Sequence, residues 1–300
     1  MRSILIAGSE GFIGHHLIQR FSKEGYQVYG CDVFETAMHG DYQYYKVTRL
    51  SPEWEEIFSG NTFDFCINAA GSGNVPYSMT HPVSDFEANT LDTIRILDAI
   101  RRLNNKCRYL HISSAAVYGN PQKLPISEDA HLQPLSPYGY HKLMAEELCR
   151  EYYHVFGIHT AIVRPFSVYG EGLRKQLLWD VCSKLKKENQ IKLFGTGKES
   201  RDFLHVKDLA MLIQLLVDHA TFEADIFNAA SGVESSLNTV ASLFENCYDS
   251  TKKITFSGES RAGDPINWRA DIRRISNLGF EPSIALEKGL PQYVSWFQAL

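Results

Sequence analysis

The sequence lacks several features that mark whole classes of protein. No run approaches the roughly 18 consecutive apolar residues that a membrane helix needs. The apolar stretch at the N-terminus is broken by Gly8, which argues against a signal peptide. Its 30 Lys and Arg residues are outnumbered by 35 Asp and Glu residues, so the basic excess of nucleic-acid binders is missing. We therefore expect neither a membrane nor a nucleic-acid partner.

The six cysteines show no spacing typical of a metal site or a disulfide framework. None belongs to a CxxC pair, and each lies in an apolar or mixed segment. A zinc site would need clustered ligands, and the sequence offers none. We interpret the cysteines as small buried side chains in a reducing compartment, which favours a cytoplasmic protein without a metal.

Short apolar runs alternate with helix-like stretches through the first half of the chain. Continuous apolar runs are typical of parallel strands that are buried on both faces. Strands are expected at residues 4–7, 28–31, 63–68, 109–113 and 159–164, and helices at 12–24, 52–58, 83–103, 137–156 and 176–188. We predict an α/β fold, a doubly wound parallel sheet of the Rossmann type with a smaller, mostly C-terminal substrate-binding part.

A glycine-rich turn follows the first expected strand. Gly8, Gly11 and Gly14 form a GxxGxxG pattern, with Phe12 and Ile13 between the last two glycines. Glycines allow a pyrophosphate to approach the backbone closely, and the following helix N-terminus supplies N–H donors. Asp32 ends the second strand, where a carboxylate accepts the ribose hydroxyls of NAD and repels the phosphate of NADP. The pattern predicts NAD as the cofactor.

A tyrosine and a lysine lie four residues apart at the start of an expected helix. Tyr138 and Lys142 form a YxxxK pattern, whose spacing puts both side chains on one helix face. A free tyrosine has a pKa near ~10, and a neighbouring cation favours its phenolate. Ser114 follows a buried strand, where ligands of open α/β sheets bind, and can bond a substrate oxygen.

These motifs, taken in order, resemble a known family. Further matching segments are residues 68–71 (NAAG), 113–119 (SSAAVYG), 164–170 (RPFSVYG), 195–208 (GTGKESRDFLHVKD) and 260–265 (SRAGDP). The chain resembles the extended short-chain dehydrogenases/reductases of the NAD-dependent epimerase/dehydratase family, which act on nucleotide sugars. The resemblance covers nearly the whole chain.

The resemblance implies a role for each matching residue. Tyr138 is the general acid or base, Lys142 binds the nicotinamide ribose, and Ser114 joins the proton network. The implied cofactor contacts are Gly8, Gly11, Phe12, Ile13, Gly14, Asp32, Ala69, Ala70, Gly71, Asn89, Ser113, Tyr138, Lys142, Pro165 and Phe166. The implied substrate contacts are Ser78, Ser114, Tyr138, Ser167, Arg201, Arg261 and Asp264. Many relatives have Asn at the position of Ser167, so nucleotide contacts there are expected to differ.

The order of the expected strands and helices divides the chain into two parts, and the resemblance implies a mode of assembly. Residues 1–166 form the dinucleotide-binding domain, and residues 203–230 return to it. Residues 167–202 and 231–300 form the nucleotide-sugar-binding part. Family members pair through two long helices, here 83–103 and 137–156, so a homodimer is expected. A role in making polysaccharide precursors is implied in the same way.

The residues after Ser114 help to choose among the reactions of the family. Dehydratases resemble one another in carrying acidic residues there, and decarboxylating relatives usually keep a Glu. Ala115 and Ala116 stand at these positions and cannot transfer protons. We predict a nucleotide-sugar epimerase that oxidises the sugar C4 hydroxyl transiently, by hydride transfer to bound NAD, and reduces it again on the opposite face. The alternative is an NAD(P)H-dependent reductase of nucleotide 4-keto sugars; a 4,6-dehydratase and a non-catalytic dinucleotide-binding protein are less favoured.

Overall fold

The computed structural model describes every residue except 39, 41, 50–52, 250 and 260–265. The chain forms two compact units, and each is described by itself. Unit 1 comprises Met1–Gly119, Leu132–Pro165 and Ala210–Phe227. Unit 2 comprises Asn120–His131, Phe166–Leu209 and Asn228–Leu300.

The centre of unit 1 is a seven-stranded sheet with the order β10-β6-β5-β4-β1-β2-β3. The ladders that join β6 through to β3 are all parallel. The strands are β1 (Ser3–Ala7), β2 (Gln27–Asp32), β3 (Gln43–Lys46), β4 (Phe65–Asn68), β5 (Arg108–Ile112), β6 (Thr160–Pro165) and β10 (Glu223–Ala229). The chain leaves β1 in one direction and returns on its other side at β4, which creates a topological switch point. The predicted doubly wound parallel sheet is therefore confirmed.

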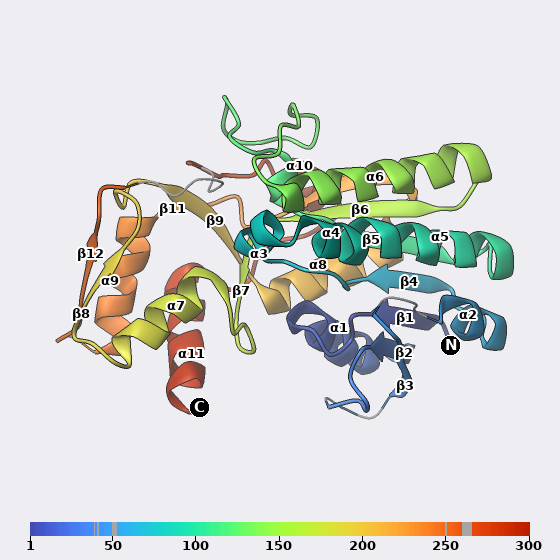
Figure 1. Cartoon of the computed structure of the whole chain (residues 1–300), viewed down its shortest axis with the longest axis horizontal. Coiled ribbons are helices and arrows are strands. Elements are labelled where there is room, and N and C mark those ends of the chain that lie inside the picture. The colour runs from blue at the N-terminus through green and yellow to red at the C-terminus, as the bar shows by residue number, and fades with distance from the viewer. Residues whose placement is uncertain (39, 41, 50–52, 250, 260–265) are drawn as a thin grey trace. The chain divides into compact units, whose positions relative to one another are not determined.

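Helices cover both faces of this sheet because each has an apolar side. Ile57, Ile96 and Cys149 belong to one buried cluster with strand residues of β1 and β4, so α2, α5 and α6 share a face. Arg20 of α1 donates to Gln214 of α8 on the other face. Figure 1 shows α5 and α6 side by side along the sheet. The α-helices of this region are α1 (Phe12–Lys23), α2 (Trp54–Gly60), α3 (Val75–Thr80), α4 (Pro82–Phe86), α5 (Asp92–Leu103), α6 (Pro137–Phe156) and α8 (Val206–His219).

The helix that carries the YxxxK pattern has the ends that its sequence predicts. The Ser136 side chain accepts from the Gly139 amide, Pro137 takes the first helical position, and Gly157 ends the helix with a φ of 68°. The structure differs from the predicted helix at 83–103, because a π-helical segment at Glu87–Leu91 separates α4 from α5. For the predicted helix at 52–58, the structure has a helix at Trp54–Gly60, and Pro52 is not among the described residues.

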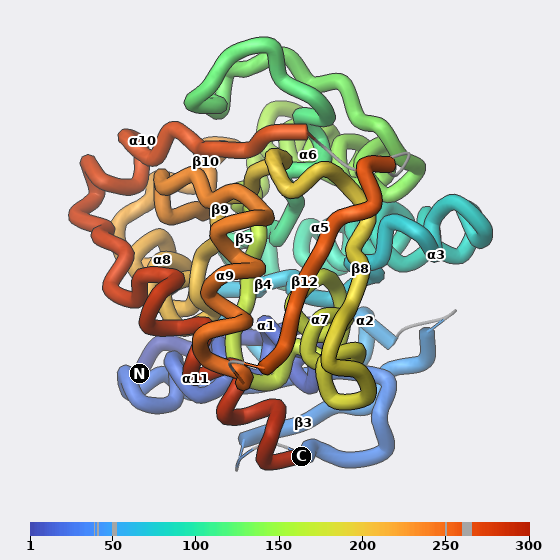
Figure 2. Tube along the Cα trace, turned by 90° about the vertical axis from the view of Figure 1, so that its left-hand side faces the viewer, coloured from blue at the N-terminus to red at the C-terminus, as the bar shows by residue number. Residues whose placement is uncertain are grey.

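Unit 2 contains two small sheets. The three-stranded sheet has the order β11-β9-β7. In the other sheet β12 pairs with β8 in parallel, and Figure 2 shows these two segments next to each other. The strands are β7 (Ser167–Tyr169), β8 (Gln190–Leu193), β9 (Ser200–His205), β11 (Glu234–Ser236) and β12 (Lys253–Phe256), and the helices are α7 (Gln176–Leu185), α9 (Leu237–Tyr248), α10 (Arg273–Ser276) and α11 (Leu286–Gln298). The sequence predicted that the chain returns to the main sheet from Phe203, whereas Phe203 lies in β9. Asp202 explains this placement, because its buried carboxylate accepts from the amides of Ser231, Gly232 and Ala270 within unit 2.

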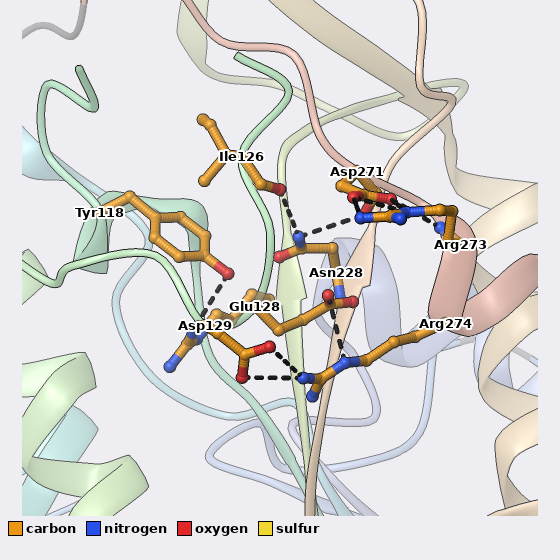
Figure 3. Close-up of polar contacts among 9 residues, drawn as sticks. Tyr118, Ile126, Glu128, Asp129, Asn228, Asp271, Arg273 and Arg274 are labelled. Atoms are coloured by element: carbon orange, nitrogen blue, oxygen red, sulfur yellow. Dashed lines mark hydrogen bonds and ion pairs between the residues drawn. The ribbon is translucent and has the colours of Figure 1, made fainter. Parts of the chain in front are cut away.

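A polar network ties distant segments of unit 2 together (Figure 3). The Asn228 side chain donates to the Ile126 carbonyl at 2.9 Å and to the Asp271 carbonyl at 3.3 Å. Arg274 makes two hydrogen bonds with Asp129, at 2.8 and 2.7 Å. These contacts fix the segment around Ile126 to the C-terminal third of the chain.

Candidate active site

The glycine turn between β1 and α1 has no room for a side chain at Gly8 or Gly14. Gly8 has a φ of +77°, and a Cβ there would lie 2.7 Å from Ala70. A Cβ on Gly14 would lie 2.0 Å from the Gly8 carbonyl oxygen. Gly11 caps α1 without a side-chain hydrogen bond, and the first turn, which includes Phe12 and Ile13, carries no acidic residue. The N–H groups at this helix end are therefore suited to a phosphate.

Asp32 stands at the carboxyl end of β2, beside the glycine turn. Its carboxylate accepts from the Val33 amide at 2.7 Å and from the Glu10 amide at 3.1 Å. Burial raises the pKa of Asp32 and the two amide hydrogen bonds oppose this rise. The hydrogen bond to Glu10 fixes the carboxylate to the turn, in the position that a ribose diol requires in dinucleotide-binding folds.

The turn after β4 is in close contact with the π-helical segment at Glu87–Leu91. Ala69 and Ala70 follow β4, and a Cβ on Gly71 would lie 2.5 Å from Oδ1 of Asn89. Asn89 is buried, and its Oδ1 has no hydrogen-bond partner among the residues that the structure describes. A buried acceptor of this kind requires a partner, and a cofactor donor would supply one. The glycine turn of Gly8, Gly11 and Gly14, which we call the glycine cradle, fits a bound dinucleotide together with Asp32 and Asn89.

The side chain of Ser114 lies near the phenol of Tyr138 and acts on its pKa. Tyr138 lies in the first turn of α6, and Ser114 follows β5 and caps the short turn at Ala115–Val117. Burial raises the pKa of Tyr138 to about 12, the Ser114 hydrogen bond lowers it, and the charge of Asp85 raises it. The chain by itself therefore keeps this phenol protonated at neutral pH, and a bound cation is needed to make it a base.

Lys142 lies one turn after Tyr138 and is almost completely buried. Its Nζ donates to the Ile112 carbonyl at 2.9 Å. Nearby, the Ser113 hydroxyl donates to Glu146, which forms a buried salt bridge with Arg164. The Lys142 ammonium is thus fixed to the end of β5, and the Ser113 side chain is fixed to Glu146 of α6.

The other predicted contacts fall in three places. The buried Ser78 hydroxyl donates to the Val75 carbonyl at 2.7 Å and accepts from the Tyr138 amide at 3.2 Å, so it supports the start of α6. Pro165 ends β6 in unit 1, whereas Phe166, Ser167 and Arg201 belong to unit 2. Arg201 donates to the Ser200 carbonyl at 2.8 Å and lies over the Trp268 ring. Arg261 and Asp264 lie outside the described residues.

Two buried polar pairs near the site were not predicted from the sequence. Asp85 of α4 is hydrogen-bonded to His141 of α6 at 2.6 Å, and Glu146 pairs with Arg164. The sequence contains a signal for the second pair, because Arg164 interrupts an apolar strand and a buried arginine requires an acidic partner. Asp85 and His141 come from separate helices, and nothing in their local sequence indicates contact.

Comparison with known proteins places the chain in a family. The model of the family described as "NAD dependent epimerase/dehydratase family" matches residues 4–230. The chain belongs to the NAD-dependent epimerase/dehydratase family. A protein of Methanocaldococcus jannaschii described as a putative UDP-glucose 4-epimerase is 30% identical to it, over 98% of both chains. The predicted family is confirmed, and NAD dependence, which the family's description states, agrees with the predicted cofactor.

Two further relatives show the range of reactions in this family. A crystal structure described as UDP-glucuronic acid 4-epimerase from Bacillus cereus, in complex with UDP-glucuronic acid and NAD, is 25% identical with a TM-score of 0.90, over 99% of each chain. A protein of Xenopus tropicalis described as UDP-glucuronic acid decarboxylase 1 is 26% identical over 99% of this chain and 72% of its own length. The fold class is confirmed, and the choice of reaction depends on the site.

Proposed function

We propose that the protein is an NAD-dependent nucleotide-sugar 4-epimerase. The observation that carries this proposal is the placement of Ser114, Tyr138 and the buried Lys142 at the carboxyl end of β5, where Lys142 donates to the Ile112 carbonyl. The relatives described as 4-epimerases support the same reaction. Their descriptions name UDP sugars, so we propose a UDP sugar as the substrate class.

Residues of the chain accept and donate the proton of the sugar 4-hydroxyl. NAD, held by the glycine turn and Asp32, would supply a reversible acceptor for the hydride of C4. Tyr138 takes the hydroxyl proton as hydride leaves C4, and gives it back when hydride returns to the opposite face. Ser114 holds the oxygen that changes between hydroxyl and ketone. Lys142 contributes positive charge that favours the phenolate form of Tyr138. No proton or electron is gained or lost over the cycle.

Two alanines after Ser114 disfavour dehydration of the sugar. Ala115 is completely buried and Ala116 donates its amide to the Ser114 hydroxyl, so the turn after Ser114 carries methyl groups. Elimination of water across C5 and C6 requires a further acid and base, and neither side chain can transfer a proton. These positions favour a reaction that needs a single acid–base group.

The remaining contacts are proposed by family resemblance. We assign NAD binding to the glycine turn, Asp32, Ala69, Ala70, Gly71, Asn89, Ser113, Pro165 and Phe166. We assign the nucleotide sugar to Ser78, Ser167, Arg201, Arg261 and Asp264, with residues 167–202 and 231–300 as its binding part. The Ser78 hydroxyl would have to exchange its hydrogen bond with the Val75 carbonyl to donate to substrate.

The proposed homodimer uses the exposed faces of α5 and α6. Large apolar side chains are exposed there, namely Leu103, Tyr140, Met144, Val155 and Phe156. Light scattering of the purified protein is expected to give twice the chain mass, and Met144→Glu with Val155→Glu is expected to give the monomer. A monomer mass for the unmodified protein at micromolar concentration would refute this assembly.

We also propose a cytoplasmic location and a role in making polysaccharide precursors. All six cysteines are described and free, as expected in a reducing compartment. In the part of the chain that the structure describes, no helix is long and apolar enough to cross a membrane.

The experiment that tests the proposed function uses purified protein without added cofactor. A panel of UDP sugars is incubated with the protein, and NMR follows the configuration at C4. Denaturation of the same sample releases the bound cofactor for identification by mass spectrometry. We expect C4 epimers to interconvert and NAD to be released. If no epimer forms under these conditions, and a 4-keto sugar is reduced only when NADH or NADPH is added, with one cofactor oxidised per product, the reductase is established instead.

A further inference from the structure

Asp85 is a buried charged group that the proposed reaction does not use. Its side chain is completely buried in α4, and Oδ2 contacts Nδ1 of His141 at 2.6 Å. Oδ1 is also buried and has no hydrogen-bond partner within the described chain. Burying a carboxylate that is only half satisfied costs free energy, so its presence beside the candidate site requires an explanation.

His141 lies between Tyr138 and Lys142 in the first turns of α6. Its ring is edge-on to Phe86, with 5.5 Å between ring centroids. Its carbonyl accepts from the Thr90 hydroxyl at 2.9 Å. Both the ring and the backbone of His141 are thus held by the segment that runs from α4 into the π-helical turn.

The same segment holds the proposed cofactor side of the site. Nδ2 of Asn89 donates to the Asp85 carbonyl at 3.0 Å and to the Ser72 carbonyl at 3.2 Å. The side chain of Asp85 is therefore hydrogen-bonded to His141, and its backbone carbonyl accepts a hydrogen bond from the Asn89 side chain. The π-helical turn shifts the register of the helix at this point, and such turns are frequent at functional sites.

We propose that Asp85 is a positioning residue that, through His141, fixes the turn carrying Tyr138 and Lys142 against the turn carrying Asn89. The hydrogen bond between Asp85 and His141 sets the distance between the proton-transferring phenol and the cofactor side. The charge of Asp85 also raises the pKa of Tyr138, which agrees with a place close to the phenol. This inference rests on the proposed function for its kinetic part.

The test compares variants that break the pair with variants that keep its hydrogen bond. Asp85→Ala and His141→Ala remove it. Asp85→Asn keeps an acceptor for the imidazole, and His141→Asn places a donor near the position of Nδ1. Asp218→Ala is the matched structural control, because it removes hydrogen bonds from Arg2 and Tyr26 at the opposite, amino-terminal end of the strands.

A positioning role is expected to lower kcat and to leave KM almost unchanged. Each alanine variant is expected to lower kcat about tenfold or more with KM within about threefold, because geometry at the reacting atoms is lost and substrate contacts are kept. The double alanine variant is expected to be no slower than either single variant, since the two residues act as one unit. Both asparagine variants are expected to stay within about threefold of the unmodified protein.

A second readout needs neither substrate nor cofactor. Amide hydrogen exchange of the cofactor-free protein is measured for the peptide that covers Tyr138 to Lys142. We expect faster exchange in Asp85→Ala and His141→Ala, and unchanged exchange in Asp218→Ala.

Several outcomes would overturn the proposal. These are alanine variants with unchanged kcat and exchange, additive losses in the double variant, or an Asp85→Asn variant as slow as Asp85→Ala. If the unmodified protein shows no turnover, the proposed function fails, and the exchange comparison still decides whether Asp85 positions the turn.

Discussion

Arg164 and Glu146 form a two-point salt bridge in which neither side chain has any exposed surface. Nε of Arg164 lies 2.9 Å from Oε1 and Nη2 lies 2.6 Å from Oε2 of Glu146. The hydroxyl of Tyr118 accepts from the same guanidinium at 2.8 Å, and the Ser113 hydroxyl donates to Glu146 at 2.5 Å. The network fixes α6 to β6 and to the loop after β5, so it supports the backbone on which Ser114 and Tyr138 stand.

Breaking this network is expected to destabilise the protein strongly. Arg164→Met keeps most of the apolar stem but leaves Glu146 as a buried charge without its partner. Removal of one member of a buried pair costs about 3–5 kcal/mol, which urea unfolding would measure as a lower midpoint. The control is Arg150→Ala, which removes an exposed pair with Glu147 on the same helix and should cost less than about 1 kcal/mol. Equal losses in the two variants would contradict the structural role of the network.

Replacement of Tyr138 by Phe is expected to abolish turnover and leave the cofactor bound. The variant loses the acid–base oxygen, and a general acid or base contributes roughly 10²–10⁴-fold to the rate. The ring itself remains, so packing and NAD affinity should change little. Single-turnover kinetics and a direct binding measurement check both parts. A Phe variant with unmodified kcat would remove Tyr138 from the mechanism.

The activity is expected to fall as the pH is lowered. The reaction begins with the phenolate of Tyr138, so protonation of this group removes the base. In the cofactor-free chain its pKa is about 12. Lys142 is part of that chain, so the further stabilisation of the phenolate that lowers this pKa toward neutrality must come from the bound cationic cofactor ring.

Ultraviolet difference spectra test this account directly. At mildly alkaline pH, the NAD-bound protein should show one more tyrosinate than the NAD-bound Phe variant. The cofactor-free proteins should not differ in this way. A kcat that rises toward acid pH, or identical spectra with bound NAD, would show that Tyr138 is not ionised for catalysis.

The glycine cradle gives a matched pair of substitutions. Gly14→Ala places a methyl group against the Gly8 carbonyl, so the turn must move and NAD binding is expected to weaken by at least tenfold. Gly60→Ala is the control, because a Cβ there meets no atom within 4 Å. Fluorescence titration with NAD measures both variants. Unchanged affinity in Gly14→Ala would indicate that the cofactor binds elsewhere.

The fold followed from the sequence wherever burial left a repeating pattern. The apolar runs that precede Gly8 and Ser113 are fully buried strands, and Ser136, Pro137 and Gly157 mark both ends of α6. The strand β3 was not predicted, because its residues are polar or aromatic and half-exposed at a sheet edge. The π-helical turn was not predicted either, since one extra residue per turn leaves the apolar spacing almost unchanged.

The candidate site divides in the same way between local motifs and long-range contacts. The glycine turn and the YxxxK pair are local spacings, so the sequence displays them. The contacts between Asp85 and His141, and between Glu146 and Arg164, join residues 56 and 18 positions apart. Such contacts depend on how α4, α6 and β6 pack, and local patterns do not record this packing.

Deuterium placed at C4 of the nucleotide sugar tests the central claim most directly. The labelled sugar is incubated with the purified protein in ordinary water without added cofactor, and NMR locates the label in the product. We predict that the product has the inverted C4 configuration and keeps its deuterium at C4, because the same hydride leaves and returns. Loss of deuterium from C4, or its appearance at another carbon, would contradict the account.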